Sequence, residues 1–167
     1  MTRLYASLML LLLLPGVLLA QETLRQSISV EADRLEMSSE SGRSIYQGNV
    51  EMRQGNMLLR ADTLELHSSG TTLQVVIAHG KPAYLERPNP QTGELLKANA
   101  GQIEYRINDS LLEMKDAARL WRGKDEFSGE HIIYELDKQL VRAFGQKNGE
   151  KNGRVRVIIQ PKKEDSR

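Results

Sequence analysis

The side chains that most often carry out chemistry are sparse and scattered in this sequence. It contains no cysteine, which excludes disulfides, thiolate nucleophiles and thiolate metal ligands. Its three histidines, His67, His79 and His131, do not stand at the H-x-H or H-x-x-x-H spacing of neighbouring metal ligands. The paired acids at 125–126 and 164–165 are typical of solvated loops, and no G-x-S-x-G or phosphate-binding glycine loop occurs. The sequence therefore predicts no catalytic residue, no metal site and no cofactor.

The composition is that of a folded chain without a strong charge. Of the 167 residues, 40% are apolar and 27% are charged, which is typical of one globular domain. The 23 basic and 22 acidic residues give a formal charge of +1, too small to hold a polyanion by counterion release. We therefore expect no nucleic-acid partner.

Residues 1–20 have the layout of a secretory signal peptide, with a basic Arg3, an apolar stretch, a break at Pro15 and a small Ala20 before polar residues. A retained membrane anchor is the alternative, although the apolar stretch is shorter than a typical span. An exported chain without disulfides fits the bacterial periplasm, because a domain of this size needs no covalent staple. We predict a cleaved signal at 1–20, a folded domain at 21–161 and a flexible charged tail at 162–167.

Apolar and polar residues alternate with a period of two through most of the remaining chain. This pattern predicts β-strands that have one apolar and one charged face. Glycines fall between the runs, as they do between short antiparallel strands. The clearest runs are 28–32, 49–53, 63–67, 102–106 and 154–157.

An internal repeat, small-x-x-apolar-x-apolar, begins at Ala32, Ala61, Ala100 and Gly129. Inside each copy the small residue and the first apolar residue stand three positions apart. An odd spacing puts two residues on opposite faces of a regular strand, so the alternation slips by one residue there. A bulge or corner at the same place in every copy would return the apolar residues to one face. We therefore predict an all-β fold, a twisted open β-jellyroll of two antiparallel sheets.

The alternation also selects the residues that should face the space between the two sheets. The simplest interpretation is an ordinary hydrophobic core. The other is a partly open sandwich that admits lipid chains, because few large aromatic side chains are present and methionine adapts to varied apolar neighbours. The inward set is Ile28, Val30, Leu35, Met37, Val50, Met52, Leu64, Leu66, Leu85, Ile103, Tyr105, Leu112, Met114, Leu120, Ile132 and Tyr134.

Five segments, in this order, resemble the OstA-like family of periplasmic lipopolysaccharide transport proteins, the LptA group. They are 46–50 (YQGNV), 60–62 (RAD), 80–83 (GKPA), 102–105 (QIEY) and 153–161 (GRVRVIIQP). The resemblance implies that the acyl chains of lipid A lie in an apolar groove between the sheets, and that ATP hydrolysis at the inner membrane drives the flow. A groove lowers the barrier to crossing water because each exposed acyl CH₂ costs roughly 0.8 kcal/mol.

The resemblance also implies which positions line the groove. They are Ile28, Leu85, and Tyr105 with Ile107, and Leu85 stands where the family often has an aromatic residue. The predicted lipid-binding set consists of Ile107 and the inward residues other than Met37 and Leu112.

The first and last strands of an open sandwich leave backbone groups unpaired, and a strand of another chain can pair with them. These edges are 28–37 and 154–160, and the second presents Val155, Val157 and Ile159. A head-to-tail contact repeats without closing and gives a filament. The resemblance implies a homo-oligomeric bridge of this kind, whose ends join related jellyrolls of LptC at the inner membrane and LptD at the outer membrane.

Other interpretations stay open. Arg154 and Arg156 could protect the edge of a monomer, or pair with lipid phosphates. If residues 1–20 are retained, the chain could be a membrane-anchored subunit related to LptC. A glycan-binding jellyroll would present exposed aromatic side chains, for which Trp121 and Tyr84 are candidates. A hydrolase acting on envelope glycan is the remaining interpretation.

Overall fold

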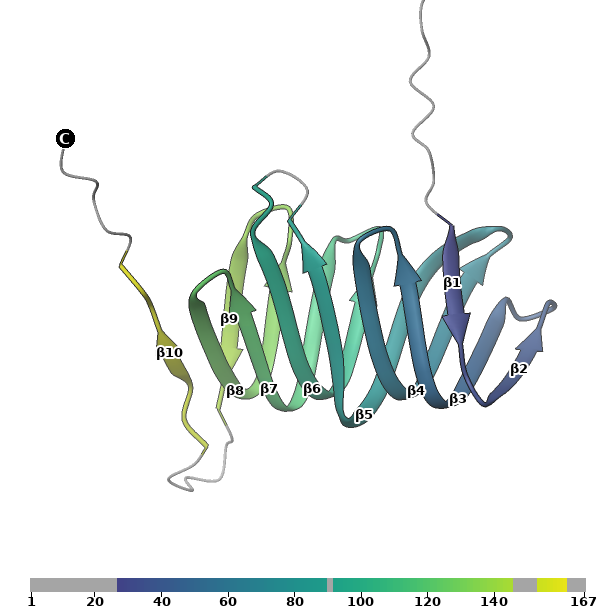
Figure 1. Ribbon diagram of the computed structural model, residues 1–167, viewed down its shortest axis with the longest axis horizontal. Helices are drawn as coiled ribbons and strands as arrows, with labels where there is room; N and C mark the ends of the chain where they lie inside the picture. Colours follow the sequence, from purple (N-terminus) through teal and green to yellow (C-terminus); the bar gives the residue numbers. More distant parts are fainter. Residues whose placement is uncertain (1–26, 90–91, 146–152, 162–167) are drawn as a thin grey trace, which may run out of the picture.

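Antiparallel strands follow one another along the chain, and most of them pair with the next strand in the sequence (Figure 1). The structure is a computed structural model, and it describes residues 27–89, 92–145 and 153–161. Within these ranges, no helix is long and apolar enough to cross a membrane. The strands are β1 (Ile28–Glu31), β2 (Arg34–Ser38), β3 (Arg43–Gln54), β4 (Met57–Ser69), β5 (Thr72–Pro88), β6 (Leu95–Arg106), β7 (Leu111–Arg122), β8 (Asp125–Glu135), β9 (Leu140–Phe144) and β10 (Arg156–Ile158).

The ten strands form one continuous sheet. Its hydrogen-bonded order is β1-β3-β4-β5-β6-β7-β8-β10, with β2 also beside β3 and β9 also beside β8. β1 and β2 pair with the two halves of β3, and β10 and β9 pair with the two halves of β8. Each end of the sheet is therefore formed by one interrupted strand, which has no further strand beside it among the described residues.

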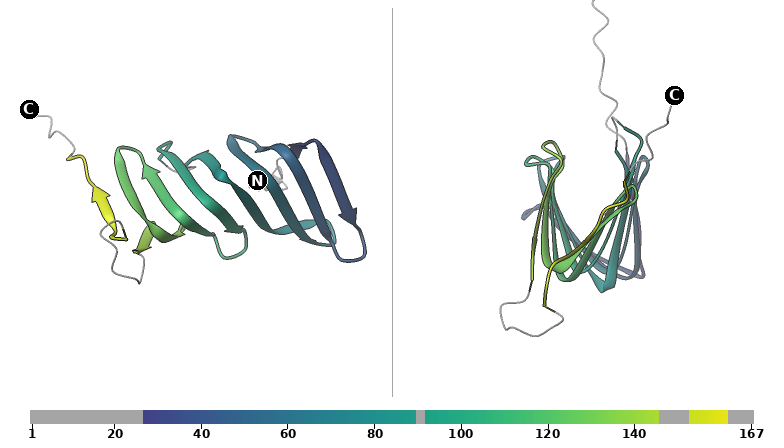
Figure 2. Two further views of the ribbon diagram at one scale, coloured as in Figure 1. Left: turned by 90° about the horizontal axis from the view of Figure 1, so that it is seen from below. Right: turned by 90° about the vertical axis from the view of Figure 1, so that its left-hand side faces the viewer.

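The long strands bend near their middles, so the sheet folds into two walls that meet at a base and diverge on the opposite, open side (Figure 2). We name them the β1 wall, which ends in β1 and β10, and the β2 wall, which ends in β2 and β9. The pairing register shifts at the same level in successive strand pairs. The shifts fall between Gln47 and Val50, Arg60 and Thr63, His79 and Ala83, Asn99 and Gln102, and Lys115 and Ala118.

These shifts confirm the predicted corner in the repeat. Ala61 and Ala100 lie inside the breaks of β4 and β6, and Gly129 lies at the break of β8. The strands that pair with β4, β6 and β8 bend in another way. β3, for example, turns through Gly48 and Asn49, whose φ angles are 79° and 48°. Gly48, like Gly80 in β5, therefore lies at a bend within a strand and not between strands.

The prediction of an all-β, open, jellyroll-like fold is confirmed. The two sheets predicted from the alternation are the two halves of one sheet. The reason is that the same two strands pair by hydrogen bonds both before and after each register break.

The pairing registers align inward residues into rows along the molecule. One row of the β1 wall contains Val30, Met52, Leu59, Leu85, Ala98, Leu120, Phe127 and Val157. One row of the β2 wall contains Leu35, Tyr46, Leu64, Ala78, Ile103, Met114, Ile132 and Ala143. At about 4.8 Å between neighbouring strands, each row extends roughly 34 Å.

Candidate functional site

The space between the walls is lined by the residues that the sequence predicts as lipid-binding. The residues buried there share an apolar side chain on an inner face; they are Val50, Met52, Leu64, Leu66, Leu85, Ile103, Met114, Leu120, Ile132 and Tyr134. Val30, Tyr105 and Ile107 are partly buried and pack against this cluster. The bends bring these residues together because they return the apolar side of each strand to the interior on both walls.

The remaining predicted residues lie at the ends of the sheet. Ile28 and Leu35, from β1 and β2, are 38% and 52% exposed. At the other end, Val157 ends an inner row of the β1 wall and is 47% exposed. Val155 and Ile159 flank β10 and are also exposed. Both ends of the apolar interior are therefore open to solvent.

The middle of the interior is closely packed. Toward the open side, a gap too narrow for a water molecule is lined by Met57, Leu85, Arg87, Tyr105, Leu112 and Leu136. Well-packed interiors of this kind do not hold an additional chain without rearrangement. A ligand between the walls therefore requires them to separate on their open side.

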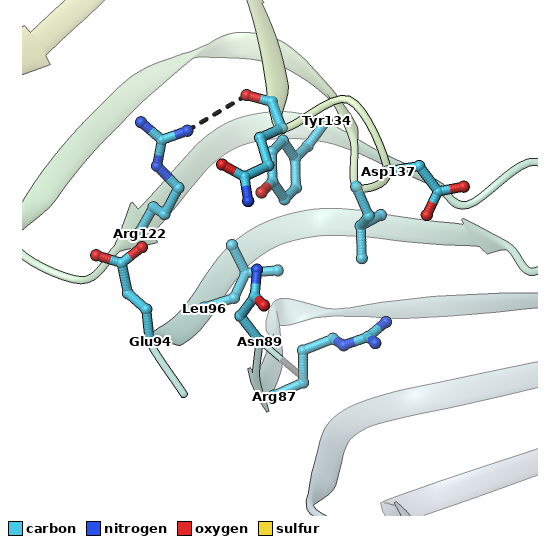
Figure 3. A pocket seen from close by; sticks show the side chains of 9 residues that line it. Arg87, Asn89, Glu94, Leu96, Arg122, Tyr134 and Asp137 are labelled. Atoms are coloured by element: carbon cyan, nitrogen blue, oxygen red, sulfur yellow. Dashed lines mark hydrogen bonds between the residues drawn. The ribbon is translucent and has the colours of Figure 1, made fainter. Parts of the chain in front are cut away.

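Two arginines reach across the open side from the β1 wall to the β2 wall. The Arg87 guanidinium donates a hydrogen bond of 3.2 Å to the Tyr105 hydroxyl and lies 5.8 Å from the centre of that ring. Arg122 donates one of 3.3 Å to the backbone oxygen of Gln139 (Figure 3). Between them lies a cavity of about 150 Å³, whose lining includes Glu94 and Asp137 as well as both arginines.

The outer face of the β2 wall is charged and internally paired. Glu113 accepts hydrogen bonds from Arg106 (3.1 Å) and His131 (2.8 Å) and forms an ion pair with Lys115 (3.0 Å). Burial of Glu113 works against its charge, but hydrogen bonds with Lys115 and His131 outweigh it and hold the pKa of Glu113 below its ordinary value of 4.5. Within the described residues, no group of three acidic, histidine or cysteine side chains could hold a metal ion.

The sequence interpretation missed several interior residues. Leu59, Val76 and Leu96 are buried in the same cluster. Extending the alternation backward from the small residues Ala61 and Ala100 predicts Leu59 and Leu96 on the inner face. The same extension places Arg87 two residues beyond Leu85 on the inner face. Because charged side chains normally lie on the outer face of a strand, the residue type alone does not predict Arg87 on the inner face.

The fold and interior together define an open, jellyroll-like β protein with an apolar space between its walls. The model of the family described as LptA/(LptD N-terminal domain) LPS transport protein matches residues 29–140. The lipopolysaccharide export system protein LptH of Pseudomonas aeruginosa is 32% identical over 142 residues, covering 83% of this chain and 81% of that protein. The corresponding protein LptA of Escherichia coli K12 is 24% identical over 138 residues, covering 81% and 72%.

A solved structure agrees with this relationship. The crystal structure of Pseudomonas aeruginosa LptH, described as the LptA-homologous periplasmic component of the lipopolysaccharide transport device, matches with a TM-score of 0.71. It is 31% identical, and the match covers 81% of this chain and 96% of that one. The chain belongs to the LptA/(LptD N-terminal domain) family of LPS transport proteins. Because these relatives are transport proteins, the expectation that the chain is not an enzyme is confirmed.

Proposed function

We propose that this protein carries lipopolysaccharide through the periplasm, with the acyl chains of lipid A between the β1 and β2 walls. The observation that carries the proposal is the pair of apolar rows that run from one end of the sheet to the other, Val30 to Val157 and Leu35 to Ala143. The names of the relatives, which are lipopolysaccharide export proteins, support the same cargo.

The shape of the interior suits an amphiphile. The sheet is continuous between the walls at the base, and on the open side the hydrogen bonds of Arg87 and Arg122 bridge them. Acyl chains that enter from the open side displace these contacts and can leave a polar head group in water. Each CH₂ removed from water contributes roughly 0.8 kcal/mol, which offsets the cost of separating the packed walls.

The same rows support an end-to-end bridge. Among the described residues, no strand pairs with the outer edge at either end of the sheet, and an apolar row of each wall ends there. A second copy that pairs its β1–β2 edge with the β9–β10 edge of the first would continue both the sheet and the apolar interior. Related jellyrolls of LptC and LptD would join the two outer ends in the same way.

Photo-crosslinking to lipopolysaccharide in living cells tests the carrier function. A photoreactive phenylalanine replaces Tyr105, which lies on the inner face of β6, or Arg106, which lies next to it on the outer face. We expect crosslinks at 105 and none at 106. A stably exported protein that is labelled at neither position would contradict the proposal.

One observation favours a second candidate function, the binding of a glycan. A depression of about 470 Å³ on the outer face of the β1 wall is lined by Tyr84, Lys97, Asn99 and Trp121, together with Leu95 and Gly123. Aromatic rings beside amide and amine donors are typical of saccharide sites. Quenching of Trp121 fluorescence by oligosaccharides would support this function, and the loss of that quenching on Tyr84→Ala would place the ligand in the depression.

The periplasmic location and the membrane-anchored alternative both depend on residues 1–20, which lie outside the described residues, as does the tail at 162–167. We propose that the signal is cleaved and the protein is periplasmic, as LptH is described to be. N-terminal sequencing of the exported protein tests this: a first residue near 21 supports a free periplasmic protein, and an intact N-terminus supports an anchored subunit.

A further inference from the structure

A second cavity on the open side differs from its neighbours in its chemistry. It measures about 430 Å³ and lies between the β3–β4 hairpin, the end of β5 with the adjacent Asn89 and Gly93, and the inner face of β6. Its lining consists of Gln54, Asn56, Met57, Arg87, Pro88, Asn89, Gly93 and Tyr105. Arg87 is the only charged residue among the described residues of this lining. The cavity therefore combines one cation, several amide groups and a phenol above the apolar side chain of Met57.

Arg87 differs from the other half-buried arginines of the described residues in having no ion pair. Arg106 lies 3.1 Å from Glu113, and Arg122 lies 3.7 Å from Asp125. Within the described ranges, Arg87 contacts the hydroxyl and the ring of Tyr105, both of which are uncharged. A guanidinium carries five N–H donors in a planar fork, so most of its donors remain available to an anion.

The position of Arg87 connects this donor group to the interior. Arg87 follows Leu85 by two residues in β5, so it shares the inner face and lies about 7 Å closer to the open side. Its side chain also borders the narrow gap above Leu85 and Leu112. A ligand whose anionic group is held by Arg87 could thus place its apolar part between the walls, on the base side of Arg87.

The neighbouring cavity is less suited to an anion. Its lining contains the carboxylates Glu94 and Asp137, and its second arginine, Arg122, is already paired with Asp125. In Figure 3 the guanidinium groups of Arg87 and Arg122 lie at opposite sides of that cavity. Of these two arginines, Arg87 is therefore the one that has no ion pair among the described residues.

We propose that the 430 Å³ cavity is a recognition site for a phosphate group on the head of the transported lipid, and that Arg87 is its anion-binding residue. This inference rests on the proposed carrier function and adds to it the chemical group that positions the head. Arg87 would exchange its hydrogen bond with the Tyr105 hydroxyl for charge-assisted hydrogen bonds to phosphate oxygens, which are stronger.

The test measures the affinity of the purified exported protein for two lipids, bisphosphorylated lipid A and the same lipid with both phosphates removed. We expect the wild type to bind the phosphorylated lipid about tenfold more tightly and Arg87→Gln to lose this preference. Arg119→Gln is the matched control, because Arg119 is exposed on the outer face of β7 and the substitution removes the same charge. Thermal denaturation followed by circular dichroism verifies that both variants are folded.

The outcomes separate the two proposals. A preference that survives in Arg87→Gln, or a wild type that binds both lipids equally, overturns the phosphate site and leaves the carrier function intact. A wild type that binds neither lipid overturns the carrier function itself. Inorganic phosphate at millimolar concentration should not displace the phosphorylated lipid, since it lacks the chains, and displacement would identify free phosphate as the ligand instead of a lipid head group.

Discussion

Ile28 and Leu85 belong to the same predicted lipid-binding set, but the structure gives them different environments. Leu85 is 1% exposed and Ile28 is 38% exposed. A charge at position 85 would be buried without a partner, whereas one at position 28 would remain solvated. Substitutions at position 85 therefore report on folding, and substitutions at position 28 report on lipid binding.

Ile28→Asp should weaken lipid binding while changing the free energy of unfolding by no more than about 0.5 kcal/mol. The physical reason is that the substitution puts a charge at the open end of the apolar interior without disturbing the core. Urea denaturation and lipid titration measure the two effects. Ser29→Asp, at an exposed neighbouring position, is the control and should bind normally. Leu85→Ala should instead cost about 2–5 kcal/mol of stability. Undiminished lipid binding in Ile28→Asp would count against a role for this end.

Glu113 should make stability depend on pH in the acid range. Its pKa in the folded protein is below the ordinary value of 4.5, so its charge stabilises the fold above pH 4.5, and this contribution is lost as the pH falls further through the folded pKa. Glu113→Gln should therefore lower the free energy of unfolding by about 1–2 kcal/mol at pH 7 and make its decline below pH 4.5 shallower. Urea denaturation at a series of pH values from about 3 to about 7, a range that brackets the pKa values of carboxyl groups, measures this. The exposed Glu40→Gln should leave the curve unchanged.

At the scale of the strand, the bends depend on a few residues with unusual backbone angles. β7 bends through Asp116 and Ala117, whose φ angles are 67° and 55°. A side chain with a Cβ is disfavoured in this left-handed region by roughly 1–2 kcal/mol, which glycine avoids. The non-glycine residues at the bend of β7 are therefore strained, and a substitution by glycine can remove this strain.

Ala117→Gly should stabilise the protein by about 0.5–1 kcal/mol, because relief of the left-handed conformation exceeds the entropy that glycine adds to the unfolded chain. The midpoint of urea unfolding measures the change. Ala118→Gly is the matched comparison, since Ala118 is buried and has no positive φ, and it should be destabilising. If both variants lost stability, the bend at 117 would not be a strained position.

At the scale of the whole molecule, the two ends of the sheet are different surfaces. In the part of the chain that the structure describes, β1 and β2 form one free edge, and β9 and β10 form the other. A contact between unlike edges gives open chains, while a contact between like edges gives a closed dimer. Mixing two variants distinguishes the two arrangements.

Val157→Pro and Leu35→Pro should each reduce end-to-end association, because proline removes a backbone donor from an edge strand. Analytical ultracentrifugation measures the size of each variant alone and of their mixture. We expect an equimolar mixture to form heterodimers, since each variant retains the edge that the other has lost. Association that is unaffected by either substitution, or a mixture that stays monomeric while the wild type associates, would contradict the head-to-tail arrangement.

Much of this fold could be predicted from local patterns. Alternation identified strand segments that lie within β3, β4 and β6, and the repeated small residues Ala61, Ala100 and Gly129 marked the bends. These features are local, since they depend on the side-chain period of a strand and on where that period slips. The segment predicted at 154–157 overlaps β10 at only two residues, because the pairing with β8, which the alternation does not specify, sets where this strand begins.

The sequence by itself determined the fold class, the inward faces and the resemblance to the family, because each of these depends on residues close together in the chain. Only the tertiary structure decided that the two walls are one sheet, that the middle of the interior is closed while its ends are open, and that Arg87 meets Tyr105 across the open side. Those facts depend on which strands pair and how sharply they bend. Most strands pair with the next strand in the sequence, but how sharply they bend and how the two walls pack are set over the whole molecule, which a local pattern does not contain.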